Sequence, residues 1–210
     1  MRILAVETSC DETAIAVAEF SGTKRGPKIR VLSNIISSQA NVHAKYGGIV
    51  PNLAKREHRR NLVPVLIQAL KEAKLLNSKR KIRGYKKPQA ILEREPELLL
   101  QFNKKILPLD PPDLDVIAVT HGPGLAPALW VGVNFAKALS LLWKKPLIPV
   151  NHMAGHLYSA VIQRNSNISQ TGADDPLGYL RAIYLTAVGN ELYANACANR
   201  MIYYFKDIFI

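Results

Sequence analysis

The sequence predicts an α/β protein, in which short apolar strands alternate with amphipathic helices. Three observations lead to this prediction. Apolar residues alternate or run together in short stretches near the N-terminus, at 2–7, 14–20 and 29–36. The order strand, glycine-containing turn and helix follows at 115–143. A further short strand, 146–150, leads directly into another helix.

The first two predicted strands are joined by small hydroxyls and acids, in the order Thr8-Ser9-Cys10-Asp11-Glu12-Thr13. Hydroxyl and N–H groups in such a turn can bind phosphate oxygens. Asp11 and Glu12 would repel a phosphate unless a cation or a water lies between, or unless one of them accepts a proton. The alternative is a plain polar turn with solvated acids.

A polar loop at 21–28 and the third strand come next, and then a long helix is expected from about 52 to 76. Pro51 suits the first helical position, and Pro64 should kink or split the helix. The predicted apolar stripe consists of Leu62, Val65, Leu66, Ala69, Leu70 and Ala73. The first half carries a basic cluster, which is either an anion-facing patch or a solvated face: Lys55, Arg56, His58, Arg59 and Arg60.

The net charge of +12 and the pI near 9.8 predict a polyanionic partner such as RNA. Part of the excess has another explanation, because nine of the 28 basic residues lie between Lys79 and Lys105. We interpret 77–112 as a basic, solvated and partly mobile insertion with one amphipathic piece at 96–106.

The strand at 115–120 is followed by the turn His121-Gly122-Pro123-Gly124 and a helix at 125–143. Its packing positions are Leu129, Val133, Ala136 and Leu139. The glycines either let a phosphate or sugar approach the backbone or allow close helix packing. The uncharged run 116–136 is long enough for a membrane span, but the glycine–proline turn interrupts it.

The two cysteines, Cys10 and Cys197, argue against a disulfide framework and for a reducing compartment. The apolar run before Glu7 is too short for a signal peptide. We therefore expect a cytoplasmic protein without a membrane partner.

His152 and His156 lie four positions apart, a spacing that places two imidazoles on one helix face and lets them share a metal ion. Asn151 is a good N-cap for that helix. The alternative is a pair of ordinary helix histidines bonded to backbone or water.

A polar loop at 164–176 marks a lobe boundary, and a second hairpin is predicted over 180–198. It resembles the first hairpin and indicates a duplicated unit. We expect residues 1–165 to form a first lobe and 176–210 to begin a second, incomplete one.

Five motifs follow one another along the chain: Glu7-Thr8-Ser9-Cys10-Asp11-Glu12-Thr13, Ser38-Gln39, His43-Ala44-Lys45-Tyr46-Gly47-Gly48-Ile49-Val50-Pro51, Gly122-Pro123-Gly124-Leu125 with Val131-Gly132-Val133, and His152-Met153-Ala154-Gly155-His156. In this order they resemble the TsaD family of tRNA threonylcarbamoyladenosine synthase subunits. The resemblance covers about residues 1–76 and 113–160.

The resemblance implies a two-lobed, actin-like or sugar-kinase-like ATPase-domain fold with a mixed sheet and flanking helices. It implies one divalent metal ion, iron or alternatively zinc, held by His152, His156 and an aspartate of a longer chain. It places Asp11 and Glu12 near that centre as catalytic acids, and a substrate-binding hairpin at Tyr184, Leu185, Thr186, Ala187 and Val188.

The implied reaction transfers the threonylcarbamoyl group from threonylcarbamoyl-adenylate to the exocyclic amine of the adenosine beside the tRNA anticodon. Accessory proteins of the modification pathway, including a homologous subunit, are implied partners. The second hairpin departs from the family's Ser-Gly-Gly-His-Thr, because residues 186–190 read Thr-Ala-Val-Gly-Asn and add side chains where backbone should meet phosphate.

Two other functions are compatible with the residues. A non-catalytic homologue could act as a scaffold or partner subunit through its first lobe. A metalloprotease is disfavoured, because a zincin needs a glutamate directly after the first histidine and this chain has Met153.

Overall fold

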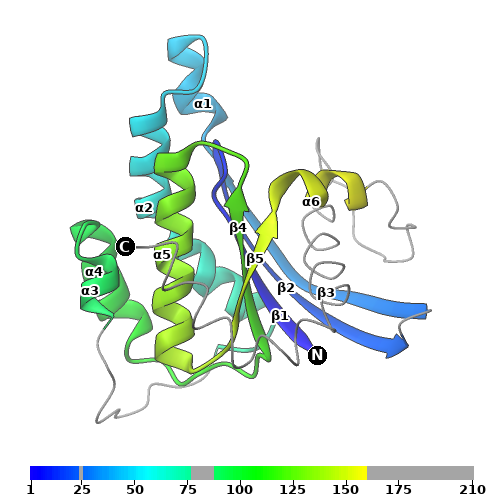
Figure 1. Ribbon diagram of the computed structural model, residues 1–210. Helices are drawn as coiled ribbons and strands as arrows, with labels where there is room; N and C mark the ends of the chain where they lie inside the picture. Colours follow the sequence, from blue (N-terminus) through cyan, green and yellow to red (C-terminus); the bar gives the residue numbers. More distant parts are fainter. Residues whose placement is uncertain (24–25, 77–87, 160–210) are drawn as a thin grey trace, which may run out of the picture.

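The computed structural model describes residues 1–23, 26–76 and 88–159, and the side chains of all of these except 22, 23, 26–28 and 156–159. Five strands form one sheet in the order β3-β2-β1-β4-β5 (Figure 1). They are β1 (Arg2–Glu7), β2 (Glu12–Thr23), β3 (Gly26–Ser38), β4 (Val116–Gly122) and β5 (Leu147–Asn151).

The sheet is mixed. β1, β2 and β3 form an antiparallel meander, whereas β4 pairs parallel to β1, and β5 pairs parallel to β4. The carboxyl ends of the three parallel strands therefore meet at one edge of the sheet, beside the hairpin tip between β1 and β2. These findings confirm the predicted α/β class and agree with the predicted actin-like arrangement.

The strand predictions at 2–7 and 146–150 are close to the observed bounds, but the β2–β3 hairpin is longer than expected. The predicted polar loop at 21–28 is largely paired, since Ser21 lies opposite Lys28 and Thr23 opposite Gly26. Polar residues are tolerated at this end because a hairpin tip projects beyond the packed core.

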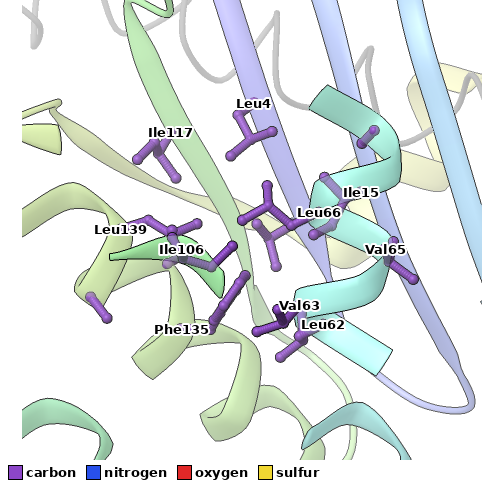
Figure 2. Packing of buried hydrophobic residues seen from close by; sticks show 14 of the residues in the cluster. Leu4, Ile15, Leu62, Val63, Val65, Leu66, Ile106, Ile117, Phe135 and Leu139 are labelled. Carbon is purple, nitrogen blue, oxygen red and sulfur yellow. The ribbon is translucent and has the colours of Figure 1, made fainter. Parts of the chain in front are cut away.

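Two long helices cover one face of the sheet: α2 (Pro51–Glu72) and α5 (Ala126–Trp143). Side chains from β1, β2, β4, α2 and α5 gather there in one apolar cluster (Figure 2). The predicted stripes are confirmed, since Leu62, Leu66 and Leu139 are fully buried. Pro64 does not split α2, because it lies on the exposed side of a helix already held by its buried face.

The other sheet face carries small side chains, among them Ala5, Ala16 and Ala118. The helix α6 (His152–Ser159) begins on this side, and its Ala154 packs against the same cluster. Asn151 caps α6 as predicted, because its Oδ1 accepts a hydrogen bond from the Ala154 N–H at 3.0 Å.

Helix α5 has the length and composition of a membrane span, and 61% of that window is buried inside the protein. Its contacts are with α2 and β4, so in this structure it is a core helix. The interruption by the glycine–proline turn is confirmed, because α5 begins only after Gly124.

The segment 88–114 corrects the prediction of a solvated insertion. It forms α3 (Gln89–Leu92), α4 (Pro96–Gln101) and the π-helix η2 (Phe102–Ile106), and the last two match the predicted amphipathic piece. Leu92, Leu98, Phe102, Ile106 and Leu114 are buried in the main cluster. Phe102 meets Phe135 of α5 edge to face, with centroids 5.9 Å apart. The remaining predicted insertion, 77–87, lies outside the described residues.

Glu95 anchors this segment to α2. Its buried carboxylate pairs with Lys55 at 3.1 Å and with Arg59. On the same helix, Arg56 and Arg60 both pair with Glu57 at 3.2 Å. The predicted basic face of α2 is thus largely neutralised by glutamates.

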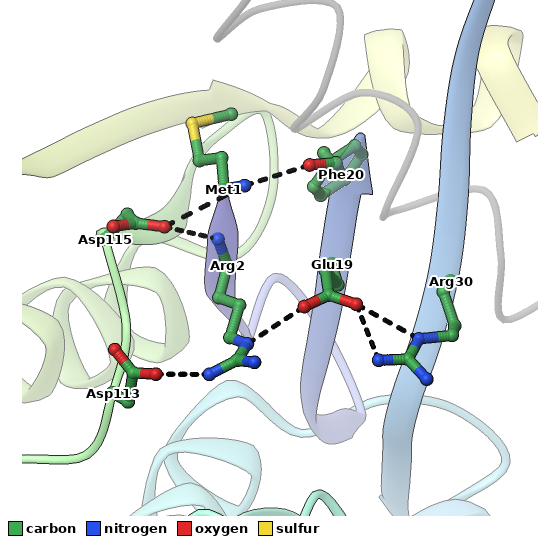
Figure 3. A network of polar contacts seen from close by, with 7 residues as sticks. All are labelled: Met1, Arg2, Glu19, Phe20, Arg30, Asp113 and Asp115. Atoms are coloured by element: carbon green, nitrogen blue, oxygen red, sulfur yellow. Dashed lines mark hydrogen bonds and ion pairs between the residues drawn. The ribbon is translucent and has the colours of Figure 1, made fainter. Parts of the chain in front are cut away.

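A polar network closes the opposite end of β1, at its amino terminus (Figure 3). The Arg2 guanidinium donates to Glu19 at 3.1 Å and also binds Asp113, and Arg30 donates to Glu19 at 2.6 Å. Such exposed pairs contribute little stability individually, but here they join β1, β2 and β3 in register.

The Glu95 anchor can be tested by mutation. We expect Glu95→Ala to lower the free energy of unfolding by about 1–3 kcal/mol, because Lys55 and Arg59 lose a desolvated charged acceptor. Urea unfolding of the chain measures the loss. Glu97→Ala is the matched control, since its 3.5 Å pair with Arg60 is half exposed and the expected change is within about 0.5 kcal/mol. Equal losses in both variants would contradict the anchor.

The described part of the chain also includes α1 (Ala40–His43) and the short 3-10 helix η1 (Ala44–Tyr46), which lie between β3 and α2. The turn that follows holds Gly47 in the left-handed region at φ 68°, a conformation that glycine adopts without strain. This connection brings Gln39 and His43 beside the amino-terminal half of α2.

Candidate functional site at the carboxyl edge of the sheet

Glu7 is a buried carboxylate at the end of β1. One oxygen, Oε1, accepts a hydrogen bond from the Ser9 N–H, and the other, Oε2, accepts one from the Thr120 hydroxyl. Strand alternation explains the pairing, because Glu7 at the end of β1 and Thr120 near the end of the neighbouring parallel strand β4 lie on the face that carries α6.

His152, the first residue of α6, lies against this carboxylate. Its Nδ1 is 3.6 Å from Glu7 Oε2, which is an ion-pair separation longer than a normal hydrogen bond. Burial raises the pKa of Glu7, but its polar contacts with His152, Ser9 and Thr120 outweigh burial and leave this pKa below its usual value. Glu7 therefore stays ionised beside the imidazole at neutral pH.

The hairpin tip is not a plain solvated turn. Its successive carbonyls each accept a hydrogen bond from a different element: Ser9 O from the Leu125 N–H at 2.7 Å, Cys10 O from His58 Nε2 at 3.1 Å, and Asp11 O from the Gln39 N–H at 2.8 Å. The tip backbone is consequently held from three directions.

His58 lies at the centre of a buried polar chain. Its Nδ1 accepts from the Thr13 hydroxyl at 2.8 Å and from Gln39 Nε2 at 3.3 Å. The Gln39 carbonyl in turn accepts from His43 Nε2 at 3.1 Å, and His43 Nδ1 accepts from the Val50 N–H at 3.3 Å. Since Nε2 of His58 donates to Cys10 O, this arrangement requires the neutral ring.

His58 was therefore wrongly placed in a basic surface patch by the sequence analysis. A signal was available, because His58 follows Ala54 and precedes Leu62 at helical spacing, on the buried side of α2. Burial lowers the pKa of His58, although contacts with Cys10 O and the nearby Glu7 and Asp11 raise it partly.

Two glycines allow α5 to approach the tip closely. A Cβ on Gly124 would lie 2.7 Å from Ser9 O, and one on Gly132 would lie 2.2 Å from Thr8 Oγ1. Thr8 Oγ1 also donates to Ala128 O at 3.0 Å, within the first turn of α5. Close packing of α5 thus accounts for Gly124 and Gly132.

The predicted catalytic acids, Asp11 and Glu12, lie half-buried at the tip and at the start of β2. Thr13 faces α2, so alternation turns Glu12 toward the sheet face shared by Glu7 and α6. Neither Glu7 nor Thr120 was predicted from the sequence to be a site residue. The sequence did contain a signal for Glu7, which is a charged residue directly after the apolar run 3–6 of its strand.

His156 is the fifth residue of α6, one turn after His152, and its side chain lies outside the described residues. The predicted substrate-binding residues Tyr184, Leu185, Thr186, Ala187 and Val188 also lie outside them. Within 1–23, 26–76 and 88–159, no group of three His, Cys, Asp or Glu is arranged to hold a metal ion. Two imidazoles one turn apart still supply nitrogen ligands that suit zinc or iron.

Comparison with known proteins identifies the family. Its profile, described as tRNA N6-adenosine threonylcarbamoyltransferase (TsaD), matches residues 30–81 and 98–176, which is more than half of the chain. The chain belongs to the TsaD family. The matched range includes 98–112, so this part of the predicted insertion is a regular TsaD element, in agreement with its buried position.

Curated relatives of the same name agree. The chain is 43% identical over 159 residues to the Thermomicrobium roseum protein, covering 76% of this chain and 32% of the relative. For the Anaeromyxobacter sp. relative, identity is 40%, with 79% and 38% covered, and for the Bartonella tribocorum relative it is 40%, with 90% and 42% covered. The chain thus spans about a third to two fifths of the length of these TsaD relatives.

Two solved structures have low similarity to the chain. YeaZ from Pseudomonas aeruginosa is 14% identical with a TM-score of 0.41, covering 77% of this chain and 49% of that one. Thermus thermophilus RuvC is 10% identical with a TM-score of 0.44, covering 90% and 94%. Similarities at this level carry no argument about the TsaD chain.

The titration of His58 predicts a pH dependence of stability. The pKa of His58 in the folded chain is below the ordinary value of 6.5. As pH falls through 6.5, His58 therefore takes up a proton in the unfolded chain before it does so in the folded chain. Stability from His58 is present above pH 6.5 and is lost progressively below it, toward the lowered folded pKa. Urea unfolding at several pH values should show a flatter acid-side decline for His58→Gln than for the unmodified chain. Parallel declines would contradict a buried, neutral His58.

The close contact between α5 and Thr8 predicts a coupled pair of mutations. We expect Gly132→Ala to cost about 1–3 kcal/mol of unfolding free energy by overpacking. The cost should shrink in a Thr8→Ala background, which removes the clashing oxygen. Gly48→Ala is the control, because nothing lies within 4 Å of its Cβ position. Strictly additive effects in a double-mutant cycle would argue against the contact.

Proposed function

We propose that residues 1–165 form the first lobe of a tRNA N6-adenosine threonylcarbamoyltransferase and that residues 176–210 begin its second lobe. The enzyme transfers the threonylcarbamoyl group from threonylcarbamoyl-adenylate to the exocyclic amine of the adenosine beside the tRNA anticodon and releases AMP. Family membership supports the reaction, and the gathering of Glu7, His152 and the acidic tip at one sheet edge supports its location. That gathering is the observation on which the proposal depends, because open α/β sheets bind ligands at this edge.

His152 and His156 would hold the divalent ion, iron or alternatively zinc, with a third ligand outside the described residues. When bound, the ion supplies Lewis-acid polarisation of the carbamoyl carbonyl and charge for the adenylate phosphate. The helix supports this role, since both positions lie on one face of α6 and His152 is fixed by the Asn151 cap beside it.

One of the two carboxylates, Asp11 or Glu12, would take the proton that the exocyclic amine loses as it attacks the carbamoyl carbon. A carboxylate accepts such a proton efficiently only if it is held at the reacting nitrogen. The hydrogen bonds to the carbonyls of Ser9, Cys10 and Asp11 support this role, because they leave the tip little freedom to move.

The net charge of +12 supports tRNA as the polyanionic substrate. The α2 face is a weaker candidate for the contact than it was from the sequence, because its cations pair with Glu57, Glu95 and Glu97. The proposed setting is the cytoplasm, with accessory pathway proteins, including a homologous subunit. The hairpin residues Tyr184, Leu185, Thr186, Ala187 and Val188 would contact the adenylate.

The proposal is tested by incubating the 210-residue chain with threonylcarbamoyl-adenylate, unmodified tRNA and Fe²⁺ or Zn²⁺, and measuring threonylcarbamoyladenosine in digested tRNA. We expect His152→Ala and His156→Ala to lose bound metal and transfer together, and Asp11→Asn or Glu12→Gln to lower the rate by about 10²–10⁴-fold with metal retained. His121→Ala, an exposed histidine, is the control. Binding of tRNA without any transfer would favour the non-catalytic scaffold instead.

A further inference from the structure

We propose that Glu7 is a positioning residue for His152. Its carboxylate selects the imidazole tautomer with the proton on Nδ1, so that Nε2 is the atom left with a lone pair. The use of that lone pair for a cation rests on the proposed function. The tautomer itself depends only on the geometry of the described residues.

Two hydrogen bonds fix the Glu7 carboxylate independently of His152. The Ser9 N–H holds Oε1 and the Thr120 hydroxyl holds Oε2, so two donors from different segments set its plane and position. The Glu7 side chain is 7% exposed, which leaves water little room to replace either donor. A buried anion held in this way acts as a preorganised acceptor.

The imidazole meets this acceptor with one particular atom. His152 Nδ1 has almost no contact with solvent and lies 3.6 Å from Glu7 Oε2. If Nδ1 carried the lone pair, two electron-rich atoms would face each other in a low-dielectric environment. If Nδ1 carries the proton, an N–H dipole faces the anion instead, and this arrangement is favoured.

The backbone keeps the ring in this orientation. His152 begins α6 directly after β5, and the Asn151 cap fixes the first turn of the helix. The His152 side chain is 16% exposed, so the ring is enclosed. A carboxylate partner on one ring nitrogen is the usual means by which proteins present the other nitrogen to a metal ion.

The test measures the tautomer directly by ¹⁵N-imidazole NMR of the metal-free 210-residue chain, at about pH 8, above the ordinary histidine pKa. The His152 signals are assigned among the five histidines by their loss in His152→Gln. We expect the protonated-nitrogen shift at Nδ1. A proton on Nε2 in the unmodified chain would overturn the proposal, whatever the variants do.

Glu7→Gln should reverse the tautomer. The Ser9 N–H still needs an acceptor, so the amide carbonyl takes the place of Oε1 and the NH₂ group takes the place of Oε2. Nδ1 of His152 then faces a donor and must accept, which moves the proton to Nε2. An unchanged Nδ1–H in a folded Glu7→Gln chain would also overturn the proposal.

Thr120→Val is the matched control. It removes the hydroxyl beside the same oxygen, nearly preserves volume and leaves the carboxylate charge in place. We expect His152 to keep the proton on Nδ1 in this variant. A reversal as large as in Glu7→Gln would mean that altered packing, and not the Glu7 acceptor, sets the tautomer.

Zn²⁺ titration by calorimetry separates this inference from the proposed function. If His152 is a ligand, Glu7→Gln should weaken Zn²⁺ binding by about 10–100-fold, while Thr120→Val should weaken it less. If the unmodified chain binds no Zn²⁺ but shows the expected tautomers, the proposed metal centre fails and the assignment of Glu7 stands.

Discussion

The fold depends on one constraint: the short turn after β1 must be held by groups that lie far away in the chain. The carbonyls of Ser9, Cys10 and Asp11 accept hydrogen bonds from the α5 turn, from α2 and from the end of β3. Each donor requires its own element to be in place. The turn is therefore ordered only when the sheet and both covering helices have assembled around it.

The two faces of the sheet differ in composition and in proposed role. The face covered by α2 and α5 carries most of the large apolar side chains. Its buried polar residues, such as His58, form hydrogen bonds within the interior. The opposite face carries alanines together with Ile3, Phe20, Val116 and Val150. Glu7 lies at the carboxyl edge of this face, against His152 of α6.

Local patterns were sufficient to predict much of this structure. Alternation located the strands, and helical spacing located α2 and α5 with their buried stripes. The Asn151 cap was also predictable, because a cap and its helix are adjacent in sequence. The family resemblance then implied an actin-like arrangement of these elements.

The rest could not be predicted because it depends on partners that are distant in sequence. Thr120 meets Glu7 across 113 residues, and Glu95 meets the cations of α2 across the segment between them. Composition made 88–112 look solvated, although most of its apolar residues are buried in the main cluster or packed against it. His58 was misplaced because it lies within a run of basic residues, and this run was given more weight than the helical spacing that places His58 on the buried side of α2.

The alternation of side chains along β1 also limits which insertions and deletions the strand can accept. Adjacent side chains of a strand point to opposite faces, so Glu7 reaches α6 while Thr8 reaches α5. Inserting or deleting one codon within β1 would exchange their faces, so that a carboxylate would meet the closely packed Ala128 and Gly132 of α5 and a threonine would replace it beside His152. The length of β1 is thus as tightly constrained as its composition.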